Sequence, residues 1–192
     1  MPQSIEEKTR ERLYTKGIYV ITKVTMEEIN ELIKWISNNR PKKNKFTILI
    51  NSGGGSPLAV IRFASFLNAL EDNVVIKGVA FETCGSAALA MLQCCHTRFA
   101  VRPCMFFIHH IHTTITLNCQ NPDMKKIELD IASSRMLEDE LVRIQSAKTG
   151  ITKRQWMRLA DHGEYDTDTP ISVDKAHKLG LIDKVINRFP CL

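Results

Sequence analysis

The sequence lacks the features that mark membrane, secreted and repeat proteins. No apolar run approaches the roughly 18 residues that a membrane-spanning helix needs, and residues 1–17 are polar and charged, without the apolar core of a secretion signal. There is no internal repeat and no low-complexity tract. These absences predict a soluble protein of the cytoplasm, or of another intracellular space, with no membrane partner.

Metal-binding cysteine patterns are also absent. None of the six cysteines lies in a CxxC pair, so the spacing argues against a zinc site. Cys94 and Cys95 are adjacent, which is a poor geometry for a disulfide. We therefore expect a reducing compartment, no structural metal and no cofactor.

The chain has little excess charge. The formal net charge is +5, and the only basic cluster, residues 40–45, falls between a predicted helix and a predicted strand with no aromatic residue interleaved. A solvated turn explains such a cluster better than a nucleic-acid site. We expect no nucleic-acid partner.

What the sequence does contain is a regular alternation of strand and helix patterns. Short apolar runs bounded by turn residues predict strands, and stripes at helical spacing predict helices between them. This alternation predicts an α/β fold of right-handed βαβ units with a mostly parallel sheet. The predicted strands are 17–21, 46–50, 74–81, 98–110 and 181–186, and the shorter predicted helices begin after Thr25 and Ser56 and cover 87–95, 152–160 and 173–179.

A length of 192 residues fits a single domain, residues 1–192, with one long helix at about 121–148. At about 1.5 Å per residue, this helix reaches about 40 Å. It is either an arm offered to another subunit or a helix curled around its own core. Residues 113–120 before it fit a small strand or an irregular excursion equally well.

Chemically useful residues gather where three predicted strands end. The loops are "NSGGGS" (51–56), "ETCGSAA" (82–88) and "FIHHIH" (107–112), which hold a glycine cradle, a candidate nucleophile and a candidate base. Because binding groups collect at the carboxyl ends of parallel strands, the combination predicts acyl transfer.

Each loop also has a plainer interpretation. The glycines fit an ordinary tight turn, and "TCGSAA" fits a helix start in which small residues pack against the sheet. His110 and His112, two residues apart on a strand, would share one face and could form a metal pair, with His109 on the other face. No acidic or cysteine partner for such a metal is evident, so we predict none.

Four segments in order resemble the Clp peptidase (ClpP) family of the ClpP/crotonase superfamily. They are "ILINSGGGS", "SAALAML", "RFAVRPCMFFIHH" and "DTDTPISVDKAHKLGLID", and the similarity runs from about Gly17 to Ile186. The resemblance implies a serine peptidase whose subunits stack as rings around a chamber, usually fed by a separate ATP-driven AAA+ unfoldase. It also implies that the long helix is the handle that pairs rings.

The resemblance assigns site residues by position. The base falls on His109, and the aspartate that stands four residues before Ser172 is Asp168. Asp161 and Asp166 are less well placed and fit ordinary loop carboxylates. The oxyanion-hole glycines correspond to Gly54 and Gly55, in a loop where the family's proline is Gly53, and the remaining amide is that of Ala87 if Ser86 is the nucleophile.

The nucleophile depends on the alignment register. Without a gap back from "RFA", the family's catalytic serine falls on Cys84, whereas a turn shorter by two residues at "QCCHT" places it on Ser86. Turns tolerate deletions, and the Ser-Ala-Ala start is seen in many relatives, including phage-type ones. We predict Ser86, with Cys84 as the second choice and neither residue as the third.

The sequence thus predicts a serine endopeptidase that cleaves unfolded polypeptides inside an oligomeric ring through Ser86, His109 and Asp168. Two alternatives stay open. The chain could be a non-catalytic ring subunit, or a crotonase-type enzyme acting on an acyl-CoA, for which Glu82 is the nearby acidic candidate.

Overall fold

The strands form one sheet of the predicted kind. A computed structural model describes residues 11–70, 73–111, 123–161 and 169–189. The strand order is β1-β2-β3-β4-β5, with β6 also beside β4, and every pairing is parallel except β4 with β5. The chain therefore has the predicted α/β fold. The strands are β1 (Ile18–Ile21), β2 (Lys45–Ser52), β3 (Val75–Gly85), β4 (Thr97–Ile108), β5 (Thr169–Ser172) and β6 (Lys184–Ile186).

Helices follow the strands as the sequence pattern predicts, and polar caps start several of them. Thr25 Oγ1 accepts a hydrogen bond from the Glu28 N–H at 3.2 Å, and Ser56 Oγ accepts one from the Ala59 N–H at 3.4 Å. Such caps satisfy amides that have no partner inside the first turn. The helices are α2 (Met26–Asn39), α3 (Pro57–Asn68), α4 (Ser86–Cys94), α5 (Met124–Thr149), α6 (Lys153–Asp161) and α7 (Val173–Lys178).

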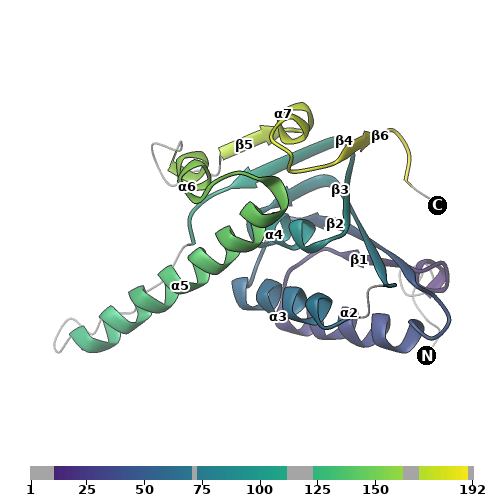
Figure 1. Ribbon diagram of the computed structural model, residues 1–192, viewed down its shortest axis with the longest axis horizontal. Helices are drawn as coiled ribbons and strands as arrows, with labels where there is room; N and C mark the ends of the chain where they lie inside the picture. The colour runs from purple at the N-terminus through teal and green to yellow at the C-terminus, as the bar shows by residue number, and fades with distance from the viewer. Residues whose placement is uncertain (1–10, 71–72, 112–122, 162–168, 190–192) are drawn as a thin grey trace, which may run out of the picture.

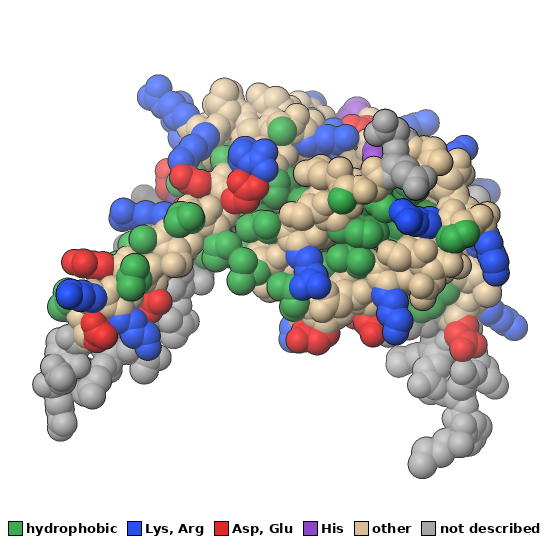
Figure 2. Space-filling view, turned by 60° about the horizontal axis from the view of Figure 1, so that its bottom comes forward, with side chains coloured by type: hydrophobic (Ala, Val, Ile, Leu, Met, Phe, Trp, Pro, Cys, Tyr) green, Lys and Arg blue, Asp and Glu red, His purple; other side chains and the backbone are tan. Residues whose placement is uncertain are grey.

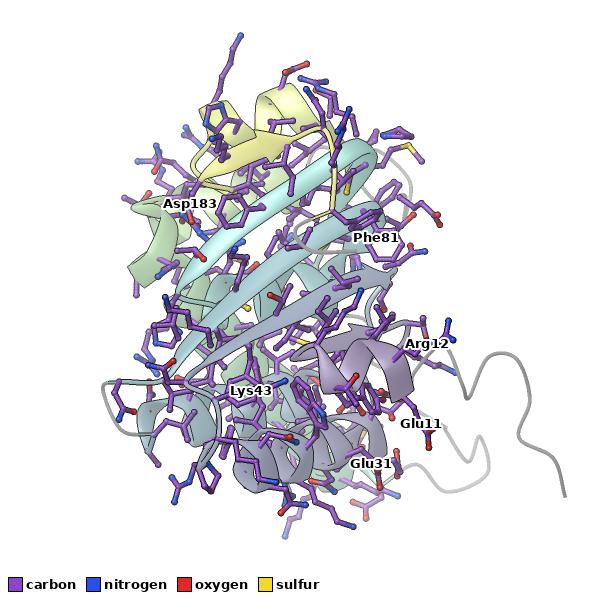
Figure 3. All side chains as sticks on the ribbon, turned by 90° about the vertical axis from the view of Figure 1, so that its right-hand side faces the viewer. Glu11, Arg12, Glu31, Lys43, Phe81 and Asp183 are labelled. Carbon is purple, nitrogen blue, oxygen red and sulfur yellow. The ribbon has the colours of Figure 1, made fainter. Side chains whose placement is uncertain are left out.

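The main core lies between the sheet and the helices that cover it. Helix α4 is at its centre, and every residue from Ala87 to Gln93 is buried. A smaller apolar cluster around Val79 includes Phe81, whose ring packs edge-on against Phe189 at 5.3 Å between centroids (Figure 3). Both clusters contact the sheet. Its central strands are uninterrupted apolar runs, which is the sequence pattern expected of strands that are buried on both faces.

The C-terminal segment is held to the sheet by a buried charge. The Arg98 guanidinium donates to the Asp183 carboxylate, to Gln93 Oε1 and to the Gly180 carbonyl. Asp183, labelled in Figure 3, also accepts from the Arg98 backbone N–H at 2.6 Å. These contacts place β6 against the first half of β4.

Strand β5 is the element that the sequence analysis missed. It has only four residues, one of them Pro170, and it pairs antiparallel with the end of β4, Phe107 opposite Pro170. So short a run carries no recognisable alternation. The predicted last strand, 181–186, is shorter in the structure, and the segment 113–120 lies outside the described residues.

Helix α5 is an arm, not a helix curled around its own core. Its 26 residues correspond to about 39 Å, and Figure 1 shows it projecting from the body. Its buried residues, Leu141, Val142 and Gln145, all lie toward its C-terminal end. Toward the N-terminal end, Leu129 is 66% exposed and Met136 is 74% exposed. Figure 2 shows hydrophobic side chains among the charged ones along this arm.

Among the described residues, no helix has both the length and the apolar character needed to cross a membrane.

Candidate active site

The segments that follow β2, β3 and β4 meet at one cavity. It has a volume of about 330 Å³ and is lined by residues from the loops after β2 and β4, from the start of α4 and from α5 and α6. Ser86, Ala87, Gly55 and His109 are among the lining residues. The strand pattern of the sequence predicts that these side chains and amides lie together, because the carboxyl ends of parallel strands meet at one edge of a sheet.

Ser86 begins helix α4 in an unusual conformation. Its φ is 51°, and within the described residues Glu82 is the only other non-glycine residue with positive φ. A sharp turn with positive φ, placed between a strand and a helix, is the geometry that exposes a nucleophilic serine in other hydrolases. Such strain persists where the surroundings enforce it, and it concentrates at functional sites.

Cys84 has the opposite environment. It lies within β3, opposite Phe106 of β4, and its side chain is fully buried. Burial raises the pKa of the Cys84 thiol well above its ordinary value, and the neighbouring Cys104 and Cys95 thiols raise it further. A thiol that stays protonated inside the core is an inert packing group.

The glycine loop approaches Ser86 closely. A Cβ on Gly54, whose φ is 127°, would lie 2.7 Å from the Ser86 Cβ and 3.2 Å from the Ala87 amide nitrogen. Gly55, whose φ is 146°, would place a Cβ 2.2 Å from the Val24 carbonyl oxygen. Both positions therefore require glycine for space as well as for conformation.

The two glycines differ in what their amides do. The Gly54 N–H donates to Ser52 Oγ at 3.1 Å, and the Gly54 carbonyl accepts from the Val24 N–H at 3.1 Å. These bonds hold the loop in place. Gly55 lines the cavity together with Ala87, so the geometry favours Gly55 over Gly54 as the amide directed at a ligand.

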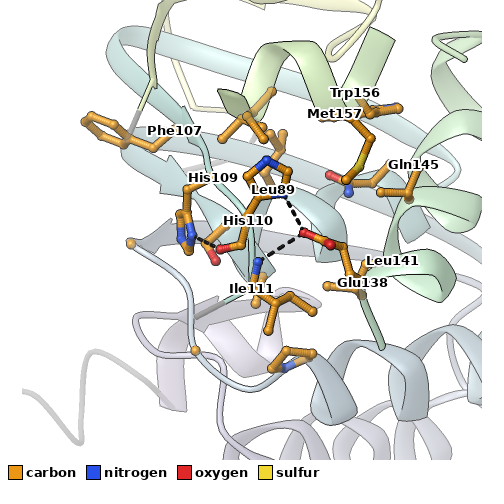
Figure 4. Close-up of a pocket in the computed structure, with 18 residues that line it drawn as sticks. Leu89, Phe107, His109, His110, Ile111, Glu138, Leu141, Gln145, Trp156 and Met157 are labelled. Carbon is orange, nitrogen blue, oxygen red and sulfur yellow. Dashed lines mark hydrogen bonds and ion pairs between the residues drawn. The ribbon is translucent and has the colours of Figure 1, made fainter. Parts of the chain in front are cut away.

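His109 follows β4 and lines the same cavity (Figure 4). Its Nδ1 lies 2.5 Å from the backbone carbonyl oxygen of His110. Because a carbonyl oxygen only accepts, this contact requires the proton to be on Nδ1. In the neutral ring, Nε2 is then the nitrogen able to take up a proton.

His110 contacts two carboxylates. Its Nδ1 lies 2.8 Å from Glu138 Oε1 on α5, and its Nε2 lies 2.7 Å from Asp161 Oδ1 on α6. Burial by itself lowers the pKa of His110, but the hydrogen bonds to Asp161 and Glu138 outweigh it, so the pKa is raised above its ordinary value. Glu138 is not among the site residues that the sequence motifs predict, and by sequence alone Asp161 fits an ordinary loop carboxylate.

A sequence signal for Glu138 did exist. It lies three residues before Leu141, on the side of the helix that carries the inward apolar stripe, and a carboxylate there needs a polar partner. Asp161 carries no comparable signal, because its contact with His110 spans 51 residues of sequence.

Among the described residues, no group of three or more His, Cys, Asp or Glu side chains is arranged so that it could hold a metal ion. Both ring nitrogens of His110 are engaged by carboxylates, and His112, its partner in the metal-pair alternative, lies outside the described residues, as does Asp168. Glu82, the acidic candidate of the crotonase alternative, is exposed and accepts from Asn51 Nδ2 at 2.6 Å. It does not line the cavity.

Comparison with known protein families shows the family to which this chain belongs. The sequence model of the Clp protease family matches residues 3–189, nearly the whole chain. The protein therefore belongs to the Clp protease family, as the resemblance of its motifs indicated. A search of curated proteins finds no match to the chain.

Proposed function

We propose that this protein is a serine endopeptidase of the ClpP type that cleaves unfolded polypeptides. The observation that carries the proposal is the strained Ser86, which begins α4 in the cavity that His109 also lines, while Cys84 is buried in the core. A hydroxyl at the start of a helix gains from the helix dipole as negative charge develops near it.

The proposed chemistry is acyl transfer. His109 Nε2 takes the proton of Ser86 Oγ as the oxygen attacks the peptide carbonyl, and the resulting imidazolium returns that proton to the leaving amine. Water then hydrolyses the acyl-enzyme by the same steps. We propose that Asp168, outside the described residues, supplies the negative charge that stabilises the imidazolium, beside the His110 carbonyl oxygen that lies against Nδ1.

Two backbone amides would stabilise the tetrahedral intermediate. We assign them to Ala87, whose N–H begins the helix after the nucleophile, and to Gly55, with Gly54 allowing the close approach of the loop. A missing donor of this kind costs roughly 2.7–4 kcal/mol of transition-state stabilisation.

The exposed apolar side chains of α5 support assembly into rings. Helix α5 extends beyond the core that its C-terminal end covers, and Met124, Leu129 and Met136 are each more than half exposed. A second copy of the arm would cover them. A chamber built this way would admit unfolded chains and exclude folded proteins, which an AAA+ unfoldase would have to unfold first. The intracellular, reducing compartment stays a prediction of the sequence.

Active-site labelling tests the nucleophile. A fluorophosphonate probe, which reacts with activated serines, is expected to label the wild-type protein and Cys84→Ala but not Ser86→Ala. Cleavage of an unstructured peptide should be lost in the same variant. Label retained in Ser86→Ala, or lost only in Cys84→Ala while that variant stays folded, would overturn the assignment.

Labelling, together with measurements of ring formation and acyl-CoA binding, separates the peptidase from the two alternative functions. A non-catalytic ring subunit would form rings but take no label and cleave no peptide. A crotonase-type enzyme would bind an acyl-CoA, but the position of Glu82 outside the cavity argues against it.

A further inference from the structure

The His110 side chain joins three elements beside the cavity. It follows β4, contacts Glu138 on α5 through Nδ1 at 2.8 Å and contacts Asp161 on α6 through Nε2 at 2.7 Å. Glu138 Oε1 also accepts from the Ile111 N–H at 3.2 Å (Figure 4). One carboxylate of the arm therefore holds both the ring of His110 and the backbone of the next residue.

This pair of contacts specifies the charge of His110. A neutral imidazole has one N–H, whereas an ionised carboxylate only accepts. Both contacts are hydrogen bonds only when both ring nitrogens carry protons, that is, in the imidazolium form. Loss of one proton would leave a lone pair facing a carboxylate and remove one of the two bonds.

The other charges of the two helices do not reach this ring. Among the described residues, Glu138 and Asp161 are the groups whose charges act on His110, and the strand end itself adds the neighbouring ring of His109. Asp139 on α5 pairs instead with Lys153 on α6 at 2.5 Å, and both are exposed. This second ion pair links the same two helices and provides a matched control.

The contacts of His110 bear directly on His109. The carbonyl oxygen of His110 is the group that lies against His109 Nδ1, and it belongs to the peptide unit between His110 and Ile111. The His110 ring and the Ile111 N–H, on either side of that carbonyl, are both held by Glu138. Movement of this clamp would therefore shift an acceptor that lies against Nδ1 and favours the tautomer with its proton on that nitrogen.

We propose that His110, clamped in its imidazolium form between Glu138 and Asp161, is a positioning residue that keeps His109 in the tautomer competent to accept a proton from Ser86. The inference rests on the proposed peptidase function. It also couples the arm helix α5 to the base, since displacement of Glu138 along with the arm would release the clamp.

The clamp makes activity depend on pH in a definite direction. It is complete below the pKa of His110, and it is lost as the pH rises through that value. Activity should therefore fall on the alkaline side. His110→Gln, whose amide group can donate to one carboxylate and does not titrate, should have lower activity and no such fall.

The experiment compares wild type with Glu138→Gln, Asp161→Asn and His110→Gln, and with Asp139→Asn as the control. Peptide hydrolysis and fluorophosphonate labelling are followed between about pH 6 and pH 10, the range around a raised histidine pKa. We expect Glu138→Gln to lower kcat roughly tenfold with little change in KM, as for a misplaced catalytic group. The loss of activity at high pH should begin at a lower pH in Glu138→Gln and Asp161→Asn. The pH profile and the kcat of Asp139→Asn should match those of wild type.

Two results would overturn the proposal. One is an unchanged alkaline fall in His110→Gln, and the other is a loss in Asp139→Asn equal to that in Glu138→Gln. Nitrogen-15 NMR of the His109 ring reports the tautomer without any turnover. The tautomer with the proton on Nδ1 should dominate in wild type, and a mixture of the two tautomers should appear in Glu138→Gln. If wild type takes no label, the peptidase function fails, and the tautomer comparison still decides for or against the clamp.

Discussion

Cys84 and Ser86 are two residues apart and have opposite environments because the strand ends between them. Cys84 still belongs to the regular ladder of β3 and packs into the core. Ser86 follows the turn, with its φ at 51°, and lines the cavity. A difference of two residues in alignment register thus separates a packing thiol from a candidate nucleophile.

Gly54 offers a test at the scale of single residues. Gly54→Ala would place a Cβ 2.7 Å from the Ser86 Cβ in a backbone conformation that side chains rarely adopt. We expect the strain to cost about 1–3 kcal/mol and the labelling of Ser86 to slow. Gly53→Ala, where a Cβ meets nothing within 4 Å, should unfold at the wild-type temperature. Thermal unfolding compares the two variants, and the labelling rate is measured for Gly54→Ala against wild type. Equal unfolding temperatures of the two variants would contradict the packing argument.

At the scale of elements, α5 has two different environments along one helix. Its C-terminal part buries Leu141 and Val142 against the body, and its N-terminal part leaves apolar side chains exposed. Glu138 lies near the boundary between these parts and contacts the strand end after β4. The arm helix therefore contacts the lining of the cavity directly.

Leu129 tests the proposed role of the arm. Leu129→Glu places a charge on a side chain that is 66% exposed, so the folded subunit should keep its stability. Assembly should weaken, because burying the new carboxylate between two arms is costly. Sedimentation velocity is the measurement, and thermal unfolding checks that the variant subunit is still folded. Undiminished assembly of Leu129→Glu would remove this surface from the interface.

At the scale of the whole molecule, the C-terminal segment depends on the Arg98–Asp183 pair. The Arg98 side chain is only 6% exposed, whereas that of Asp183 is 40% exposed. Burial by itself raises the pKa of Asp183, but its hydrogen bonds with Arg98 outweigh this and the pKa is lowered. The pair therefore stabilises the fold above the ordinary aspartate pKa, and this contribution is lost as the pH falls through the lowered value.

Asp183→Asn should reduce the free energy of unfolding by about 1–3 kcal/mol at neutral pH, because it leaves the Arg98 charge poorly compensated. The difference from wild type should shrink in acid. Asp174→Asn is the control, since its partner Arg102 is also on the surface and exposed pairs contribute little. Urea unfolding at several pH values is the measurement. A constant difference across the acid range would contradict the assignment to the carboxylate charge.

The sequence by itself predicted the α/β class, the alternation of strands and helices in a mostly parallel sheet and the three segments that meet at the cavity. These are local and periodic properties, as the caps of Thr25 and Ser56 illustrate. For the nucleophile it left three alternatives, which are Ser86, Cys84 and neither residue. Burial of Cys84 and the positive φ of Ser86 became visible only in the folded chain, because both depend on where β3 ends.

Only the tertiary structure placed β5 beside β4 and brought Glu138 and Asp161 to His110. These contacts join residues far apart in sequence, and no spacing rule connects them. It likewise decided that α5 projects as an arm, since one apolar stripe fits a helix packed on its own core and a helix offered to a partner equally well. Local pattern sets which elements form, whereas packing decides which side chains meet.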